Sequence, residues 1–272
     1  MQQEGNVAVV IGCTGLVGKN LVDLLIPHKQ KVIIISRRRE HLWMHVQKVH
    51  HIYLENFDDM HSIEDQLDGV TEAYCAIGSS LEKKGIDEER FIHVELDYPI
   101  MFQRLIYKKF NTGVYPPNCK RQFFYISAKG ASESKFTLFI FNIKARAEKA
   151  LCEYHAEFME KNNPSVLLLH VVRPGLLSGQ RENDHRSVEN FFLVVDQIFR
   201  PIMPKSATSI TGEAVAKSMV SISMAVCKEN EERLIKNDHC GKVGHFKEKE
   251  RQKLGIIVHD NGYLKEYAND FN

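Results

Sequence analysis

Residues 6–26 read Asn6-Val-Ala-Val-Val-Ile-Gly12-Cys-Thr-Gly15-Leu-Val-Gly18-Lys-Asn-Leu-Val-Asp-Leu-Leu-Ile26. An apolar run, Val7–Ile11, predicts a buried strand, and glycines spaced three apart follow it. Apolar residues then recur at helical spacing until Pro27. A strand, a glycine turn and a helix N-terminus in this order favour a dinucleotide pyrophosphate, because the free N–H groups and the helix dipole face the anion. The predicted contacts are Gly12, Thr14, Gly15, Leu16, Val17 and Gly18.

Short apolar strand patterns alternate with helical patterns along the first two thirds of the chain. The predicted strands are Val7–Ile11, Val32–Ile35, Ile52–Leu54, Ala73–Ile77, Phe123–Ile126 and Val166–Val172. The predicted helices are Leu16–Ile26, Glu88–Lys109, Phe136–Glu160 and Gly212–Cys227. Continuous apolar strands separated by helices are typical of a parallel sheet covered on both faces. We therefore expect an α/β, doubly wound, Rossmann-like fold with a small C-terminal substrate-side region.

We expect one dinucleotide-binding domain over residues 1–227, with a substrate-side region beginning at about residue 175. Ligands bind outside the carboxyl ends of the strands in open α/β sheets, so this late region is expected to close over the cofactor. Residues 228–272 are rich in Lys and Glu and are expected to form a charged C-terminal extension.

Composition narrows the class of partner. The chain has 272 residues and a formal net charge of +1, which gives no reason to expect a nucleic-acid partner. Its six cysteines are scattered without paired spacing, as in reduced cytoplasmic proteins. No leader pattern precedes the first strand, and no apolar run is long enough to span a membrane. We expect a soluble cytoplasmic protein with no membrane association.

The second predicted strand ends at Ser36-Arg37-Arg38. Sites specific for NAD place Asp or Glu near this point to bind the ribose 2′-hydroxyl. A serine and guanidinium groups suit a 2′-phosphate instead, so the expected cofactor is NADP(H), with Arg37 as the main phosphate contact. The alternative is that these arginines are ordinary solvated side chains.

Further predicted cofactor contacts follow the later strands. Asn56-Phe57 follows the third strand, where an adenine ring would lie. The small residues Cys75-Ala76-Ile77-Gly78 end the fourth strand and allow close backbone approach, and Arg173-Pro174 ends the sixth strand beside the nicotinamide half. Each of these could equally be a strand end followed by a turn.

These motifs, taken in order over residues 6–180, resemble the atypical short-chain dehydrogenases, in particular the Tat-interacting-protein-like oxidoreductase branch. The matching segments are Gly12-x-x-Gly15-x-x-Gly18, Ser36-Arg37-Arg38, Asn56-Phe57, Gly78-Ser-Ser with Lys83–Gly85, Phe91-x-x-Val94-x-x-Asp97-Tyr98, Ile126-Ser127-Ala-Lys129-Gly130-Ala131, Lys144-Ala-Arg-Ala-Glu148 and Val172-Arg173-Pro174-Gly175. The resemblance implies a Rossmann-like fold, NADP(H) binding and reductase activity.

The family resemblance also implies catalytic residues. The family uses a serine after the fifth strand and Tyr-x-x-x-Lys on the next helix, in which tyrosine donates a proton to a carbonyl and lysine holds the nicotinamide ribose. Ser127 and Lys144 match the serine and the lysine, but Ile140 stands where the tyrosine belongs. Isoleucine can donate no proton, and general acid catalysis contributes about 10²–10⁴-fold. Tyr98, Tyr107 and Tyr125 are other phenols in the chain.

Two function hypotheses therefore stand side by side. In the first, the protein is an NADPH-dependent reductase of a small carbonyl or semialdehyde that uses Ser127, Lys144 and an unidentified proton donor. In the second, it is a non-enzymatic NADP(H)-binding regulator or scaffold with a protein partner. A third, weaker hypothesis invokes a zinc or nucleic-acid site around Cys240 and His245, but the outer ligand positions hold Asn237 and Glu250, so no metal site is expected.

Overall fold

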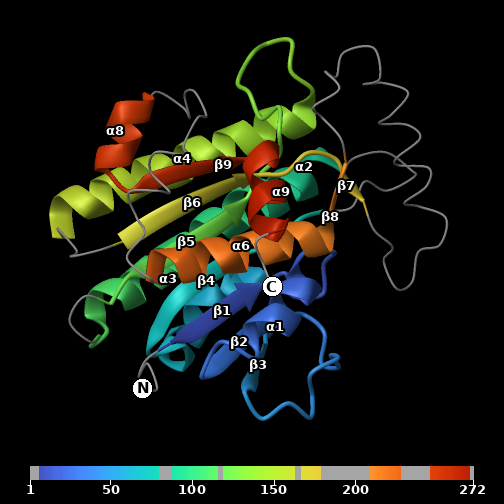
Figure 1. The fold of residues 1–272 in the computed structure, drawn as a ribbon, viewed down its shortest axis with the longest axis vertical. Coiled ribbons are helices and arrows are strands. Elements are labelled where there is room, and N and C mark those ends of the chain that lie inside the picture. The colour runs from blue at the N-terminus through green and yellow to red at the C-terminus, as the bar shows by residue number, and fades with distance from the viewer. Residues whose placement is uncertain are drawn as a thin grey trace.

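The computed structural model describes residues 6–79, 87–115, 119–162, 167–178, 209–227 and 246–269. Seven parallel strands form one sheet in the order β3-β2-β1-β4-β5-β6-β9 (Figure 1). Their bounds are β1 Val7–Ile11, β2 Lys31–Ser36, β3 Val49–Tyr53, β4 Val70–Cys75, β5 Arg121–Ile126, β6 Leu167–Arg173 and β9 Ile256–Asp260. The expected doubly wound α/β fold is confirmed.

Helices cover both faces of the sheet. One layer contains α1 (Gly18–Leu25), α6 (Gly212–Cys227) and α9 (Asn261–Asn269), which lie side by side over one face (Figure 1). The other layer contains η1 (Phe57–Leu67), α2 (Glu88–Ile92), the π-helical turn η2 (His93–Asp97), α3 (Tyr98–Thr112) and α4 (Phe139–Asn162). Short elements complete the chain: β7 Leu177–Ser178, β8 Ile210–Thr211 and α8 Glu248–Lys253.

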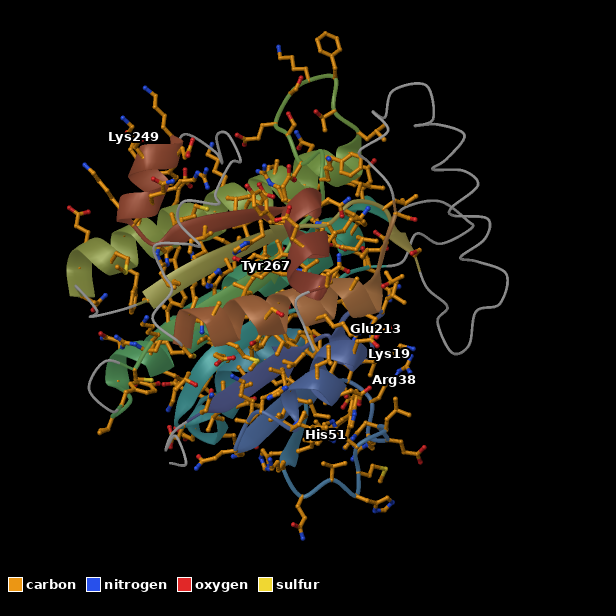
Figure 2. All side chains as sticks on the ribbon, in the orientation of Figure 1. Lys19, Arg38, His51, Glu213, Lys249 and Tyr267 are labelled. Atoms are coloured by element: carbon orange, nitrogen blue, oxygen red, sulfur yellow. The ribbon has the colours of Figure 1, made fainter. Side chains whose placement is uncertain are left out.

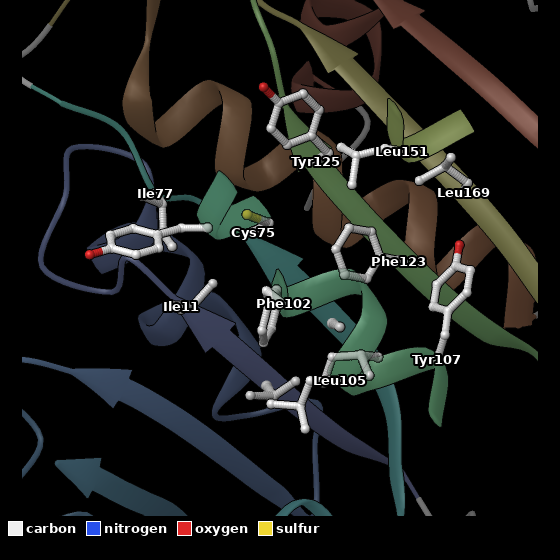
Figure 3. Close-up of a cluster of buried hydrophobic side chains, with 14 of the residues drawn as sticks. Ile11, Cys75, Ile77, Phe102, Leu105, Tyr107, Phe123, Tyr125, Leu151 and Leu169 are labelled. Atoms are coloured by element: carbon white, nitrogen blue, oxygen red, sulfur yellow. The ribbon is translucent and has the colours of Figure 1, made fainter. Parts of the chain in front are cut away.

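Alternating residues of each strand enter two separate cores. On β5, Phe123 and Tyr125 face α3 and α4, and Figure 3 shows them beside Phe102 and Leu151. Phe124, between them, faces the α1 and α6 side, where it stacks on Tyr74 with ring centroids 4.8 Å apart. A strand buried on both faces has apolar residues at every position, which is why the sequence predicts these strands as continuous runs.

Three strand and helix predictions need correction. The third strand runs from Val49 to Tyr53 rather than from Ile52 to Leu54, because His50 and His51 interrupt its apolar pattern. The fourth strand begins at Val70 rather than Ala73 and contains the buried Glu72, whose charge hid the strand pattern. The carboxylate of Glu72 is paired with the ammonium of Lys29, and both side chains are buried. The predicted helix Glu88–Lys109 is divided into α2, η2 and α3, because a wider π-helical turn interrupts it.

The C-terminal segment also differs from expectation. Residues 246–269, part of the expected charged extension, supply α8, the seventh strand β9 and helix α9. Strand β9 pairs with β6, and α9 packs on α6. Residues 179–208 of the expected substrate-side region, Lys83–Gly85 and the Cys240–His245 segment lie outside the described residues. No helix in the described part of the chain is long and apolar enough to cross a membrane.

Candidate dinucleotide-binding site

The glycine turn after β1 is built against the end of β4. Gly12 has φ of +83°, and a Cβ there would lie 2.4 Å from the Ala76 carbonyl oxygen, so only glycine fits. A Cβ at Gly18 would lie 2.1 Å from the Gly12 carbonyl oxygen, so α1 packs directly on the turn. Two of the predicted contact segments, the glycine turn and Cys75–Gly78, are therefore adjacent.

Gly15 plays a different part in this turn. Its N–H donates to the Gly12 carbonyl at 2.9 Å, and among the described residues a Cβ there would meet the Gly12 and Ala76 carbonyl oxygens alone, at 3.2 and 3.8 Å. Thr14 is exposed and Val17 is buried. Among the described residues no side chain caps the start of α1, and an uncapped helix start favours an anion. The Lys19 N–H in this first turn donates to the Gly15 carbonyl at 3.1 Å.

At the end of β2 the two arginines are exposed to solvent, whereas the serine side chain is buried and hydrogen-bonded to neighbouring residues. The Ser36 hydroxyl donates to the Arg38 carbonyl at 2.8 Å, accepts from the Arg38 N–H at 3.1 Å and contacts His51 Nε2 at 3.2 Å. This hydroxyl shapes the turn that presents Arg37 and Arg38, both of which are exposed. Figure 2 shows the Arg38 side chain at the surface of the molecule. Phosphate contact by Arg37 and Arg38 remains a prediction.

Asn56 and Phe57 lie beside these arginines. The Arg37 guanidinium lies 5.4 Å from the centroid of the Phe57 ring. Phe57 itself is buried and packs edge-on against Tyr98, while Asn56 accepts the Asp58 N–H at 3.2 Å and caps η1. The Tyr98 hydroxyl donates to Asn56 Oδ1 at 3.5 Å. The structure thus brings Arg37, Asn56 and Phe57 together, with Phe57 forming the floor beneath the guanidinium.

Both cysteines near the turn, Cys13 and Cys75, are buried thiols. Burial raises the pKa of the Cys13 thiol and of the Cys75 thiol to about 12. The thiolate, which is the nucleophile, is therefore absent at neutral pH.

Lys144 and Ser127 meet at the carboxyl end of β5. The Lys144 ammonium donates to the Ile126 carbonyl at 3.0 Å and lies 5.2 Å from the centroid of the Tyr125 ring. The Ser127 hydroxyl is buried and has no hydrogen-bond partner among the described residues. A buried polar atom without a hydrogen-bond partner lowers stability, so this hydroxyl is a candidate to bind a ligand group. Ile140 lies in the first turn of α4, one helical turn before Lys144.

The tyrosines named above do not replace the phenol. Tyr98 is bonded to Asn56 at the Arg37 end, and the Tyr107 hydroxyl lies 2.6 Å from His155 Nδ1 inside the core. Tyr125 is fully buried, and burial together with the charge of Glu95 raises its pKa well above 10. A phenol that is harder to ionise and sealed in the core is a poor acid.

Glu95 is the site residue that sequence reasoning missed. Its Oε2 lies 2.6 Å from Lys144 Nζ, and its Oε1 accepts hydrogen bonds from the Ser79 N–H and hydroxyl at 2.6 and 3.0 Å. In the family motif Phe91-x-x-Val94-x-x-Asp97-Tyr98, position 95 is one of the unspecified residues. Its only signal in the sequence is an acidic residue inside an otherwise apolar helix face.

The end of β6 carries a second buried ion pair. Arg173 Nε donates to Glu148 Oε1 at 2.8 Å, and its Nη2 lies 2.5 Å from Oε2. The guanidinium therefore ties β6 to α4. The Pro174 carbonyl accepts the Lys129 N–H at 2.8 Å, and the Gly175 N–H donates to Asn261 Oδ1 at 3.0 Å. Direct cofactor contact by Arg173 and Pro174 stays a prediction.

Comparison with known proteins supports the Rossmann-like fold. A sequence model described as the NAD dependent epimerase/dehydratase family matches residues 8–108. No curated protein gives a significant match.

Solved structures match nearly the whole chain. The 3-oxoacyl-acyl-carrier-protein reductase of Brucella melitensis, solved with NAD, has a TM-score of 0.64 and 14% identity, covering 97% of this chain and 98% of its own. A short-chain dehydrogenase of Burkholderia cenocepacia, solved with NADP, has a TM-score of 0.60 and 14% identity, covering 99% and 93%. The UDP-glucose 4-epimerase of Thermotoga maritima has a TM-score of 0.57 and 12% identity, covering 97% and 98%. The chain has the Rossmann-like fold of the short-chain dehydrogenases.

Proposed function

We propose that this protein binds NADP(H) across the carboxyl ends of β1, β2, β4 and β5 and reduces a small carbonyl compound. The observation that carries the proposal is the glycine turn. A Cβ at Gly12 or Gly18 would collide with backbone, whereas a Cβ at Gly15 would meet no described atom closer than 3.2 Å, and no described side chain caps the start of α1. This arrangement fits a pyrophosphate.

The choice of NADP(H) rests on the end of β2. Arg37 and Arg38 are exposed there, and the strand ends on Ser36 instead of a carboxylate that would repel a 2′-phosphate. Arg37 rests on the Phe57 ring, which limits the freedom of its guanidinium before any ligand arrives.

The reductase activity rests on Lys144 and Ser127. A bound nicotinamide supplies the hydride for carbonyl reduction. Lys144 would bind the nicotinamide ribose, and the buried Ser127 hydroxyl would orient the carbonyl or the nicotinamide amide. We also propose that the residues after 175 form the substrate side, and that the protein belongs to the Tat-interacting-protein-like branch of the atypical short-chain dehydrogenases.

The isoleucine at position 140 favours a second candidate function. A non-enzymatic NADP(H)-binding regulator or scaffold would keep the cofactor site and a protein partner without a phenolic acid. In that case a panel of carbonyl compounds gives no NADPH oxidation above the uncatalysed rate, and Ile140→Tyr creates activity. Turnover by the wild type that is abolished in Lys144→Ala excludes this candidate.

A cytoplasmic location is part of the proposal. Five cysteines in the described residues are free, as expected in a reducing compartment.

Calorimetric titration with NADPH and NADH tests the proposal. The proteins are the wild type, Arg37→Ala and, as a matched control, Arg104→Ala. Arg104 is also exposed and lies over an aromatic ring, that of Tyr154, but it belongs to α3. We expect NADPH affinity to fall only in Arg37→Ala, with NADH affinity unchanged. Absence of binding to either dinucleotide would exclude both candidate functions.

A further inference from the structure

A buried ion pair stands beside the predicted catalytic serine. Glu95 is 3% exposed and Lys144 is 9% exposed, and their charged atoms are 2.6 Å apart. Buried charges are rare unless they are paired, because each loses its hydration. Replacing such a pair by apolar residues is often neutral or stabilising, so stability alone does not account for these two residues.

The chain holds the Glu95 carboxylate from two sides. Glu95 lies in the π-helical turn η2, a form of helix that occurs often at functional sites. Ser79, which follows the end of β4, donates two hydrogen bonds to Oε1 and leaves Oε2 to Lys144. The carboxylate therefore lies in a fixed position between the end of β4 and α4.

Lys144 is held in turn. Its ammonium has three donors. It forms an ion pair with Glu95 Oε2 and donates one hydrogen bond, to the Ile126 carbonyl. Within the described residues the ammonium therefore keeps N–H groups both for the nicotinamide ribose and for a carbonyl. The Ile126 carbonyl immediately precedes Ser127, so these N–H groups and the unpartnered Ser127 hydroxyl belong to the same end of β5.

We propose that the Lys144 ammonium, positioned by Glu95, is the proton donor that replaces the missing phenol. This inference rests on the proposed reductase function. A bound NADPH would supply the hydride for the new C–H bond at the carbonyl carbon and would leave as NADP⁺. The carbonyl π pair would move to the oxygen, which takes a proton from Lys144 Nζ as that N–H bond breaks. The neutral amine then takes a proton from water. Lys144 is the catalytic residue and Glu95 the positioning residue.

Lys144→Arg separates proton donation from charge. Arginine keeps a positive charge that pairs with Glu95, but its guanidinium gives up no proton in proteins. The substrates are NADPH and 4-nitrobenzaldehyde as the carbonyl probe. We expect NADPH affinity, measured by fluorescence titration, to change less than about fivefold while kcat falls about 100-fold or more. A Lys144→Arg protein that retains wild-type kcat overturns the proposal.

Glu95→Gln tests the positioning role, with Glu72→Gln as the matched control. Both changes remove one carboxylate charge from a buried Lys–Glu pair, but Glu72 pairs with Lys29, away from Ser127 and Lys144. We expect Glu95→Gln to lower kcat about tenfold or more with little change in NADPH affinity, because a small misplacement of a reacting group is costly. Glu72→Gln should lower only the unfolding midpoint. Equal effects of the two variants on kcat overturn the positioning role.

The outcomes separate this inference from the function on which it rests. A wild type that binds no NADPH refutes the proposed function and the inference with it. If the wild type binds NADPH but reduces no carbonyl, proton donation is refuted while cofactor binding stands. If Lys144→Arg and Glu95→Gln turn over normally, only the inference fails.

Discussion

Gly15→Ala should separate dinucleotide binding from folding. The added Cβ would lie 3.2 Å from the Gly12 carbonyl oxygen, a contact that shifts of a few tenths of an ångström relieve. Gly15 does not have a positive φ, so alanine meets no backbone strain there. We expect the free energy of unfolding to change by less than about 1 kcal/mol.

The effect on binding should be far larger. A methyl group at Gly15 occupies the side of the turn on which the pyrophosphate is proposed to lie, and it moves the phosphates away from the backbone N–H groups. A hydrogen bond to a charged group contributes about 1.5–3 kcal/mol. Loss of one or two such bonds should raise the Kd for NADPH about ten- to a thousandfold.

Gly18→Ala is the opposing control. Its Cβ would lie 2.1 Å from the Gly12 carbonyl oxygen and 2.8 Å from the carbonyl carbon, so backbone must move. Overpacking of this kind costs about 1–3 kcal/mol or more. Urea unfolding measures both stabilities, and fluorescence titration measures NADPH binding. If Gly15→Ala binds NADPH as the wild type does, the pyrophosphate does not lie on this turn. If Gly18→Ala unfolds at the wild-type urea concentration, the packing argument is wrong.

Three further predictions concern other parts of the fold. Trp43, the chain's single tryptophan, is buried near the end of β2, where its indole N–H donates to Asp23 at 2.6 Å. Excitation of Trp43 should therefore yield fluorescence emission from bound NADPH by energy transfer. Trp43→Phe should abolish this emission without abolishing NADPH binding. Burial lowers the pKa of His155 to about 4, below its ordinary 6.5, so the neutral form is favoured and stability falls as pH drops from 6.5 toward 4. Between pH 7 and pH 5 this histidine should lower the free energy of unfolding by about 2 kcal/mol. His155→Gln should lose less of its free energy of unfolding over the same pH interval, as measured by urea unfolding. Lys29→Met leaves Glu72 buried without its counter-ion and should cost about 3–5 kcal/mol, whereas Lys29→Met with Glu72→Leu should recover much of the loss in thermal unfolding.

Local pattern was sufficient for most of the fold. Val7–Ile11 is predicted with its observed bounds, because a strand buried on both faces is apolar at every position. Strand β9 was not predicted, because His259 and Asp260 shorten its apolar run to three residues and a charged segment precedes it. Its pairing with β6, far away in the sequence, makes it a strand.

Site residues divide in the same way. The glycine turn could be predicted because its chemistry lies within one βα unit. Ser36 shows the limit of this reasoning, since spacing places it at the cofactor but does not reveal that Arg38 and His51 already occupy its hydroxyl. The role of Glu95 could not be predicted from the sequence, because it depends on contacts with Lys144 and Ser79, which lie in two other parts of the chain.

Ile140 and Glu95 are best understood together. Helix α4 carries Lys144 and has the apolar Ile140 one turn earlier. A buried ammonium requires a counter-charge, and here it comes from η2 instead of α4. The acidic partner of Lys144 therefore lies on a neighbouring helix and not on α4. The proposed activity depends on whether this ion pair leaves a Lys144 proton within reach of a carbonyl. The kcat of Lys144→Arg, compared with that of the wild type, decides this.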